Sequence, residues 1–268
     1  MRAAMFQMTS GTDPAANAAA IVEMVARAKG EGADMLFTPE MAGYLDRDRK
    51  RAAATLRSEA EDAVLARVRD AAARAGLWVH LGSLPLKGER ADGRWANRSL
   101  MIDDSGAIRA RYDKIHLFDV DVPGSVESHR ESAHTVPGRQ PRVVDTPMGR
   151  LGLSVCYDMR FPELFRVMSR QGAEMFVVPS AFTVPTGRAH WESLLRSRAI
   201  ENLCGLIAPA QWGMHANGRE TFGDSMIIDH WGKVLARMPG GTGCVVADID
   251  AASRIDARAR FPVLEHRV

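Results

Sequence analysis

Short apolar runs alternate with helical patterns along the whole chain, and no other feature of the sequence constrains the fold more. Residues 2–8 predict a first strand and residues 35–37 a second. Between them, Asp13 offers a helix N-cap and Pro14 a first helical position. Strands that alternate with helices are typical of the α/β class. The sequence therefore predicts an α/β protein.

The same alternation continues to the end of the chain. Helices are expected over 57–75, from Pro162 onward and over 189–203; strands are expected at 77–82, 97–103, 107–112, 142–146, 150–156, 175–178, 204–210, 222–229, 233–237 and 243–249. Residues 113–141 contain several Pro and Gly breakers and predict an irregular segment, which at this length is usually functional. Because there is no Gly/Ser linker or repeat, we expect residues 1–268 to form a single domain.

Composition and charge exclude several classes of protein. Hydrophobic residues make up 46% of the chain and charged residues 25%, and the formal net charge is +2. There is no basic stripe for nucleic acid, no apolar run of roughly 18 residues for a membrane, and no secretory signal at the N-terminus. The three cysteines, Cys156, Cys204 and Cys244, lie too far apart to indicate a disulfide framework or a zinc motif. The sequence predicts a cytoplasmic protein with reduced thiols.

Cys156 ends a predicted strand and is followed at once by a charged turn. Open α/β sheets bind ligands at this end of their strands, and the helix start that follows could stabilise a thiolate or an oxyanion. An isolated cysteine is more often an inert core residue. The neighbouring charges of Asp158, Arg160 and Glu163 favour a reactive thiol instead.

Glu40 and Lys114 also follow the ends of predicted strands. A glutamate in an apolar pocket can transfer protons near neutral pH, and a lysine beside a reacting carbonyl can stabilise its developing charge. Taken singly, each residue is more often a solvated surface charge. Their equivalent positions at strand ends make a shared site the better hypothesis.

The chain resembles the nitrilase-like carbon–nitrogen hydrolases over essentially its whole length. The segments that carry the resemblance are FTPEM (37–41), YDKIHLFDVDVPG (112–124), GLSVCYDMRFPEL (152–164), PSAFTVPTGRAHWESLLRSRAIEN (179–202), GDSMIIDHWGKVLA (223–236) and FPVLEHR (261–267). The resemblance implies a four-layer αββα sandwich that pairs as a homodimer or a larger homo-oligomer. The helix after Cys156 and the 189–203 helix are the expected contacts.

The resemblance also implies a catalytic set, with no cofactor or metal. The family's Glu–Lys–Cys triad corresponds to Glu40, Lys114 and Cys156, and the backbone N–H of Tyr157 to an oxyanion donor. The family's second glutamate corresponds to Glu131, although the loop from Lys114 is one residue longer here. Glu127 is set aside because its distance to Pro137-Gly138 does not fit.

The turn CYDMRFPE resembles the amidase branches, and the flanking loops resemble the ω-amidases and the deaminated-glutathione amidases. Both cleave a 2-oxoglutaramate-type amide; the first group releases ammonia and the second releases Cys-Gly. Ala210-Gln211-Trp212-Gly213 favours the second group, and another small amide or carbamoyl substrate is a further alternative. Arg160 is the candidate for a substrate carboxylate, with an ion pair to Asp158 or Glu163 as its alternative role. Phe182, Thr183 and Thr186 are expected to line the pocket.

Other interpretations explain the sequence less well. Residues 152–156 miss the Gly-x-Ser-x-Gly motif of serine hydrolases at the last position, so Ser154 is expected only to support the pocket. His116, His129 and His134 lack the spacing of zinc ligands. A non-catalytic metabolite-binding protein and a thiol redox sensor remain alternatives from other classes.

Overall fold

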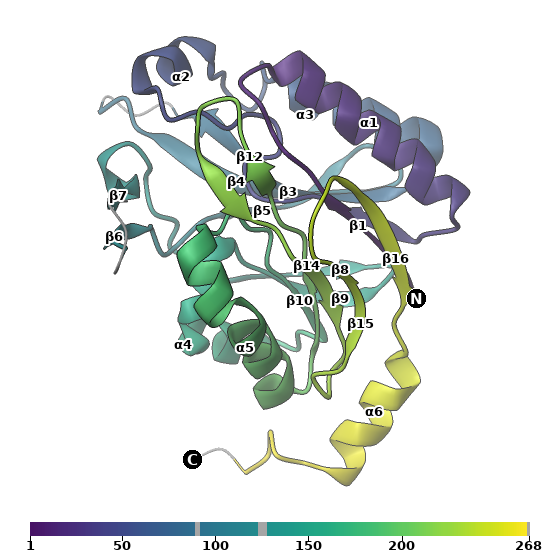
Figure 1. The fold of residues 1–268 in the computed structure, drawn as a ribbon. Helices are drawn as coiled ribbons and strands as arrows, with labels where there is room; N and C mark the ends of the chain where they lie inside the picture. The colour runs from purple at the N-terminus through teal and green to yellow at the C-terminus, as the bar shows by residue number, and fades with distance from the viewer. Residues whose placement is uncertain (89–91, 123–127, 267–268) are drawn as a thin grey trace.

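The computed structural model describes residues 1–88, 92–122 and 128–266, in which two β-sheets pack face to face and helices cover both outer faces (Figure 1). The first sheet consists, in spatial order, of β16 (Gly243–Asp248), β1 (Arg2–Gln7), β2 (Met35–Phe37), β3 (Trp78–Lys87), β4 (Trp95–Ile102) and β5 (Ile108–Asp113). The second consists of β15 (Val234–Met238), β14 (Ser225–Ile228), β11 (Gly205–Ala208), β10 (Met175–Val177), β9 (Gly149–Leu153) and β8 (Arg142–Thr146). The predicted αββα sandwich is confirmed.

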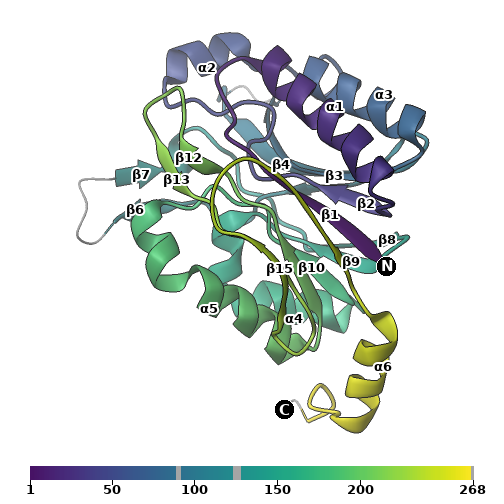
Figure 2. The same cartoon turned by 45° about the vertical axis from the view of Figure 1, so that its right-hand side comes forward.

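The helices lie on the two outer faces of the sandwich. They are α1 (Pro14–Gly30) and α3 (Ala63–Ala75) over the first sheet, and α4 (Pro162–Arg170) and α5 (Val184–Asn202) over the second. Figure 2 also shows α6 (Ala251–Arg260) projecting from the bottom of the sandwich. None of the helices in the described ranges is long and apolar enough to cross a membrane.

Alternate residues of the first sheet face different layers, because successive side chains of a strand point to opposite faces. On β1, Ala3 and Met5 join the core between the two sheets, whereas Ala4 and Phe6 pack against α1 and α3. On α1, Ile21, Met24, Val25 and Ala28 recur at helical spacing and are all buried. Each sheet is therefore apolar on both faces, which explains the nearly continuous apolar runs of its strands.

The short elements surround the strand ends where the site lies. They are α2 (Arg49–Thr55), β6 (Asp119–Asp121), β7 (Ser128–Arg130), β12 (Trp212–Met214), β13 (Glu220–Phe222) and two 3₁₀ helices, η1 (Glu131–Ala133) and η2 (Cys156–Arg160). The pairs β6–β7 and β12–β13 form small hairpins apart from the main sheets. The described residues of the 113–141 segment are thus mostly irregular, as predicted, but they include β6, β7 and η1.

Several predicted boundaries are wrong; the strand expected at 77–82, for example, extends to Lys87. The helix expected over 57–75 begins only at Ala63, because the Asp62 carboxylate caps it by accepting from the N–H of Leu65. The helix expected from 189 begins at Val184, since Pro185 in its first turn fits a helix start. The strand expected to end at Cys156 stops at Leu153.

Candidate active site

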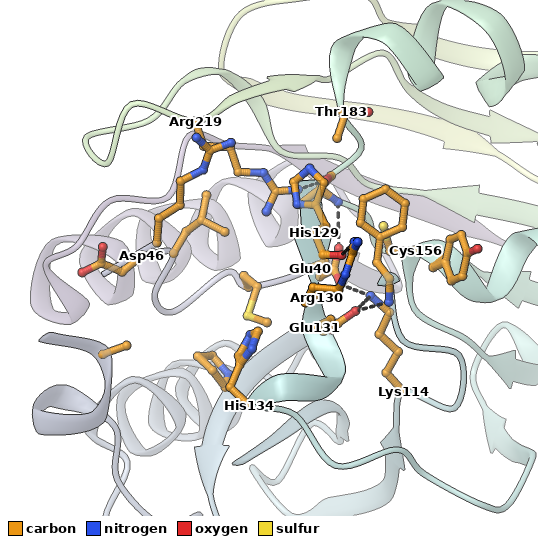
Figure 3. Close-up of a pocket in the computed structure, with 18 of the residues that line it drawn as sticks. Glu40, Asp46, Lys114, His129, Arg130, Glu131, His134, Cys156, Thr183 and Arg219 are labelled. Carbon is orange, nitrogen blue, oxygen red and sulfur yellow. Dashed lines mark hydrogen bonds and ion pairs between the residues drawn. The ribbon is translucent and has the colours of Figure 1, made fainter. Parts of the chain in front are cut away.

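The carboxyl ends of β2, β5 and β9 meet at one edge of the sandwich and bring the predicted residues together. Glu40 lies just past β2, Lys114 directly follows β5, and Cys156 lies just past β9. The first two come from one sheet and the third from the other, so face-to-face packing of the sheets assembles the site. Figure 3 shows all three side chains directed toward one pocket.

Cys156 stands at a sharp turn between β9 and η2. Its φ is +51°, in the left-handed region that residues other than glycine seldom occupy, and such backbone strain persists where its surroundings fix it. Here the N–H of Cys156 donates to the carbonyl oxygen of Pro179 at 2.9 Å. Tyr157 lies in the first turn of η2, where backbone N–H groups lack an intrahelical acceptor. The turn therefore holds Cys156 at the start of η2, directly before this unpaired backbone donor.

Lys114 is fully enclosed between two carboxylates. Its Nζ donates to Glu40 Oε1 at 3.0 Å and to Glu131 Oε2 at 2.8 Å. Glu131 in turn accepts from the backbone N–H of Phe118 at 2.8 Å, which fixes its position despite the longer loop. The structure thus brings Glu131 to the site; Glu127 lies outside the described residues.

Asn97 on β4 joins this cluster and was missed by sequence reasoning. Its Nδ2 donates to Glu40 Oε1 at 2.9 Å and to Glu131 Oε1 at 3.2 Å. The strand also contains Arg98 and Ser99, so its sequence offered no distinct signal for Asn97. The amide holds the two carboxylates in a fixed relation to each other.

The charges of the cluster follow from burial and from these contacts. Burial alone would raise the pKa of Glu40, but the charge of Lys114 and the hydrogen bonds from Cys156 and Lys114 outweigh it, so the pKa lies below its usual value. Burial likewise opposes the charged form of Lys114, yet Glu131 and Glu40 hold its pKa well above the usual value. Burial raises the pKa of the Cys156 thiol, and Glu40 raises it further. At neutral pH the site holds a neutral thiol beside a carboxylate and an ammonium group.

Asp158 connects the turn of Cys156 to the segment that carries Lys114. Its Oδ2 accepts from the N–H of Val155 at 2.9 Å and from the Tyr112 hydroxyl at 2.7 Å, and its Oδ1 accepts from the N–H and Nδ1 of His116 at 3.0 and 2.7 Å. These contacts leave Asp158 without an ion pair to Arg160 among the described residues. The alternative role of Arg160 as a brace paired with Asp158 is therefore wrong.

The cavity above Cys156 has a volume of about 490 Å³, which suits a small-molecule substrate. Arg160 and Phe182 line it together, with the guanidinium 5.4 Å from the ring centroid, and Arg160 also lies 3.3 Å from His190 Nδ1. Thr183 and Thr186 line it as well, with their hydroxyls 2.7 Å apart. All four predicted lining residues are thus at the pocket.

Ser154 lies outside the cavity, and the described residues hold no metal-binding cluster. Ser154 donates its hydroxyl to the carbonyl oxygen of Val177 at 2.7 Å, so it ties β9 to β10 rather than lining the cavity. No cluster of three or more His, Cys, Asp or Glu side chains suited to a metal ion occurs within residues 1–88, 92–122 and 128–266. His116, for example, is engaged with Asp158.

The sequence matches the family model described as carbon-nitrogen hydrolase over residues 2–259. A relative from Yersinia enterocolitica, named deaminated glutathione amidase, is 41% identical over 267 residues, which span 98% of this chain and 91% of that protein.

Solved structures of related proteins have the same fold as this chain. The Caenorhabditis elegans NitFhit protein superposes with a TM-score of 0.92 at 39% identity, over 99% of this chain and 64% of that chain. An amidase mutant from Nesterenkonia sp. AN1, with acrylamide added to its active-site cysteine, superposes with a TM-score of 0.80 at 30% identity over 98% of both chains.

Proposed function

The chain belongs to the carbon–nitrogen hydrolase family, and we propose that it is an amidase that cleaves deaminated glutathione through a thioester on Cys156. One observation carries the proposal: the buried Glu40–Lys114 ion pair stands beside the Cys156 thiol at the base of a substrate-sized pocket. Nucleophile, base and cation are the groups that acyl transfer requires.

In the first step, Glu40 takes the thiol proton while the sulfur of Cys156 attacks the amide carbon. Glu40 suits this role because it is ionised at rest and hydrogen-bonded to the thiol. The ammonium of Lys114 and the N–H of Tyr157 stabilise the negative charge that develops on the carbonyl oxygen. Glu40 then gives its proton to the leaving nitrogen, the C–N bond breaks, and the acyl group remains on sulfur.

In the second step, water releases the acyl group. Glu40 takes a proton from the water, whose oxygen attacks the thioester carbon, and the proton returns to sulfur as the carboxylic acid leaves. Glu131 and Asn97 act as positioning residues, because they hold Lys114 and Glu40 without facing the thiol. The geometry supports a complete cycle within this chain.

The substrate assignment rests on the pocket and on the relative's name. A 2-oxo acid presents a carboxylate at one end of its acyl chain, and a guanidinium recognises carboxylates with two parallel hydrogen bonds. Arg160 lies beside the Cys156 turn and has no carboxylate partner among the described residues, so we assign it this role. Replacing Arg160 by Ala should raise KM sharply for an acidic amide but not for a neutral one.

The proposal is tested by a coupled assay for 2-oxoglutarate, with deaminated glutathione and 2-oxoglutaramate as separate substrates. Wild-type protein should prefer deaminated glutathione, and Cys156→Ala should lose roughly 10⁴-fold or more in kcat. Cys244→Ala is a matched control, because this cysteine is also buried but does not line the pocket. A preference for 2-oxoglutaramate would make the protein an ω-amidase instead.

A non-catalytic binding protein would behave differently. It would bind these amides and protect Cys156 from alkylation, but it would release no 2-oxoglutarate. No turnover of either compound, with Cys156 still readily alkylated, would preserve the thiol chemistry and reject the substrate.

We also propose that the protein is cytoplasmic and pairs through α4 and α5. Val167 on α4 and Ile200 on α5 are exposed, and Trp231 and Phe261, whose ring centroids are 5.7 Å apart, are exposed as well. Light scattering should show a dimer or larger assembly that Ile200→Asp weakens. A monomeric wild-type protein at micromolar concentration would refute the pairing.

A further inference from the structure

Arg219 lines the pocket with a hydrogen-bond donor that the protein leaves unused. It lies in the turn between β12 and β13, and its Nη2 donates to the carbonyl oxygen of Ala181. Its Nε is buried and has no hydrogen-bond partner among the described residues. A buried donor without an acceptor costs free energy, especially on a charged group. Because Arg219 also lines the pocket, its guanidinium is a candidate to bind an anionic ligand there.

Two other cations that line the pocket are already paired with carboxylates, whereas Arg160 is assigned to the acyl end of the substrate. Lys114 lies between its two carboxylates, and Arg130 forms a bidentate pair with Asp121 at 2.9 and 3.0 Å. Arg219, by contrast, forms no ion pair within the described part of the chain. Its charge is therefore available to an anionic ligand.

The contacts of Ala181 place Arg219 on the side of the pocket where the amine departs. The N–H of Ala181 donates to Glu40 Oε2 at 2.9 Å, while its carbonyl oxygen accepts from Arg219. One residue therefore separates the two side chains, which puts the guanidinium within roughly 10 Å of the carboxylate. Arg219 and Lys114 lie on opposite sides of Glu40 (Figure 3). In the proposed mechanism Glu40 protonates the leaving nitrogen, so Arg219 is within reach of a group that extends beyond that nitrogen.

We infer that Arg219 is a specificity-determining residue that binds a carboxylate carried by the leaving amine. This inference rests on the proposed amidase function and deepens it. Two extended residues span roughly 7 Å from amine to carboxylate, and a hydrogen bond adds roughly 3 Å. A dipeptide such as Cys-Gly thus has the reach to place its carboxylate on Arg219 while its nitrogen remains at Glu40. Arg160 and Arg219 then hold the two anionic ends of the substrate.

The test uses two substrates that share an acyl group and differ only in the leaving group. Deaminated glutathione releases an anionic dipeptide, whereas 2-oxoglutaramate releases ammonia. Arg219→Gln should lower the ratio of their kcat/KM values by roughly 10- to 100-fold, mainly through a higher KM for deaminated glutathione, because a hydrogen-bonded charge is lost. Arg219→Lys should recover part of the ratio. Arg130→Gln is the matched control, and we expect it to shift the ratio less than two-fold.

A second readout does not depend on turnover. Millimolar glycylglycine should slow alkylation of Cys156 by iodoacetamide in the wild type but not in Arg219→Gln, and glycylglycine amide should protect neither protein. Wild-type protein that hydrolyses neither amide would refute the proposed function while this readout still tests Arg219. Equal losses of kcat/KM for both substrates, or equal protection of both proteins, would overturn the inference and leave Arg219 as a brace for Ala181.

Discussion

Asp158 is fully buried, and its carboxylate accepts four hydrogen bonds from residues that flank Lys114 and Cys156 in the sequence. Replacing it by Asn keeps the shape of the side chain but converts one oxygen into an NH₂ group. Whichever oxygen is replaced, two contacts to a charged acceptor are lost. With Oδ2 replaced, the N–H of Val155 faces a donor and the hydroxyl of Tyr112 must turn to accept; with Oδ1 replaced, the N–H of His116 faces a donor and its Nδ1 must change tautomer to accept.

The expected cost follows from those two lost contacts. A hydrogen bond to a charged group contributes roughly 1.5–3 kcal/mol, so losing two should destabilise the protein by roughly 3–5 kcal/mol after local relaxation. For a chain of this size each kcal/mol lowers Tm by roughly 2–4 °C, and we therefore expect Asp158→Asn to lower Tm by roughly 8–15 °C. The same change should lower kcat, because the turn of Cys156 and the segment of Lys114 lose their common anchor.

Tyr112→Phe is the matched control, since it removes one of the four donors and retains the carboxylate. It should cost roughly 1.5–3 kcal/mol, because a single hydrogen bond to the charged group is lost. Thermal unfolding followed by circular dichroism at several scan rates, together with urea titration, measures both variants. If Asp158→Asn melts within about 2 °C of Tyr112→Phe, the carboxylate does not hold the two segments and the reasoning is refuted.

Three further predictions concern the surroundings of the site. Gly82→Ala should destabilise the protein by roughly 1–3 kcal/mol or more, because a Cβ there would lie 2.0 Å from the carbonyl oxygen of Thr38. Thr38 lies two residues before Glu40, so kcat should fall as well. A variant with the Tm and kcat of the wild type would contradict this prediction. Burial lowers the pKa of His80 from 6.5 to about 3. Between pH 3 and pH 6.5 the unfolded chain therefore binds a proton that the native state does not, so the free energy of unfolding falls as the pH decreases. The expected slope is about 1.4 kcal/mol per pH unit at pH values well below 6.5. Urea titrations at pH 7.0, 5.5 and 4.5 should show this slope, and His80→Gln should flatten it; equal slopes would refute the assignment. Glu131→Gln should lower kcat roughly 10- to 100-fold with a smaller change in KM, because Lys114 loses one of its two carboxylates, and unchanged kcat would remove Glu131 from the cycle.

The sequence predicts the order of strands and helices well, because each buried strand is a distinct apolar run between breakers. It predicts boundaries less well where composition does not change. Residues 57–62 share the charged and Ala-rich character of the helix that follows, so only the cap at Asp62 marks its true start. The C-terminal helix α6 was missed, although Asp250 caps it by accepting from two backbone N–H groups.

The residues of the site also fall into those that the sequence predicts and those that it does not. Cys156, Glu40 and Lys114 carry local signals, since each follows a recognisable strand. Asn97 reaches Glu40 only through the pairing of separate strands, and the unused donor of Arg219 depends on where a distant turn folds over Ala181. Such contacts are set by register and by packing between the sheets, and a sequence states neither.

The pairing of β1 with β16 joins the first and last strands of the chain, with Arg2 opposite Asp248. β16 is the edge strand of the sheet that supplies Glu40 and Lys114, and it covers one side of β1. A chain without β16 would expose the backbone N–H and C=O groups along that side of β1, and such an unpaired edge can pair with a strand of another molecule. The strand that completes this sheet therefore also protects it from edge-to-edge association.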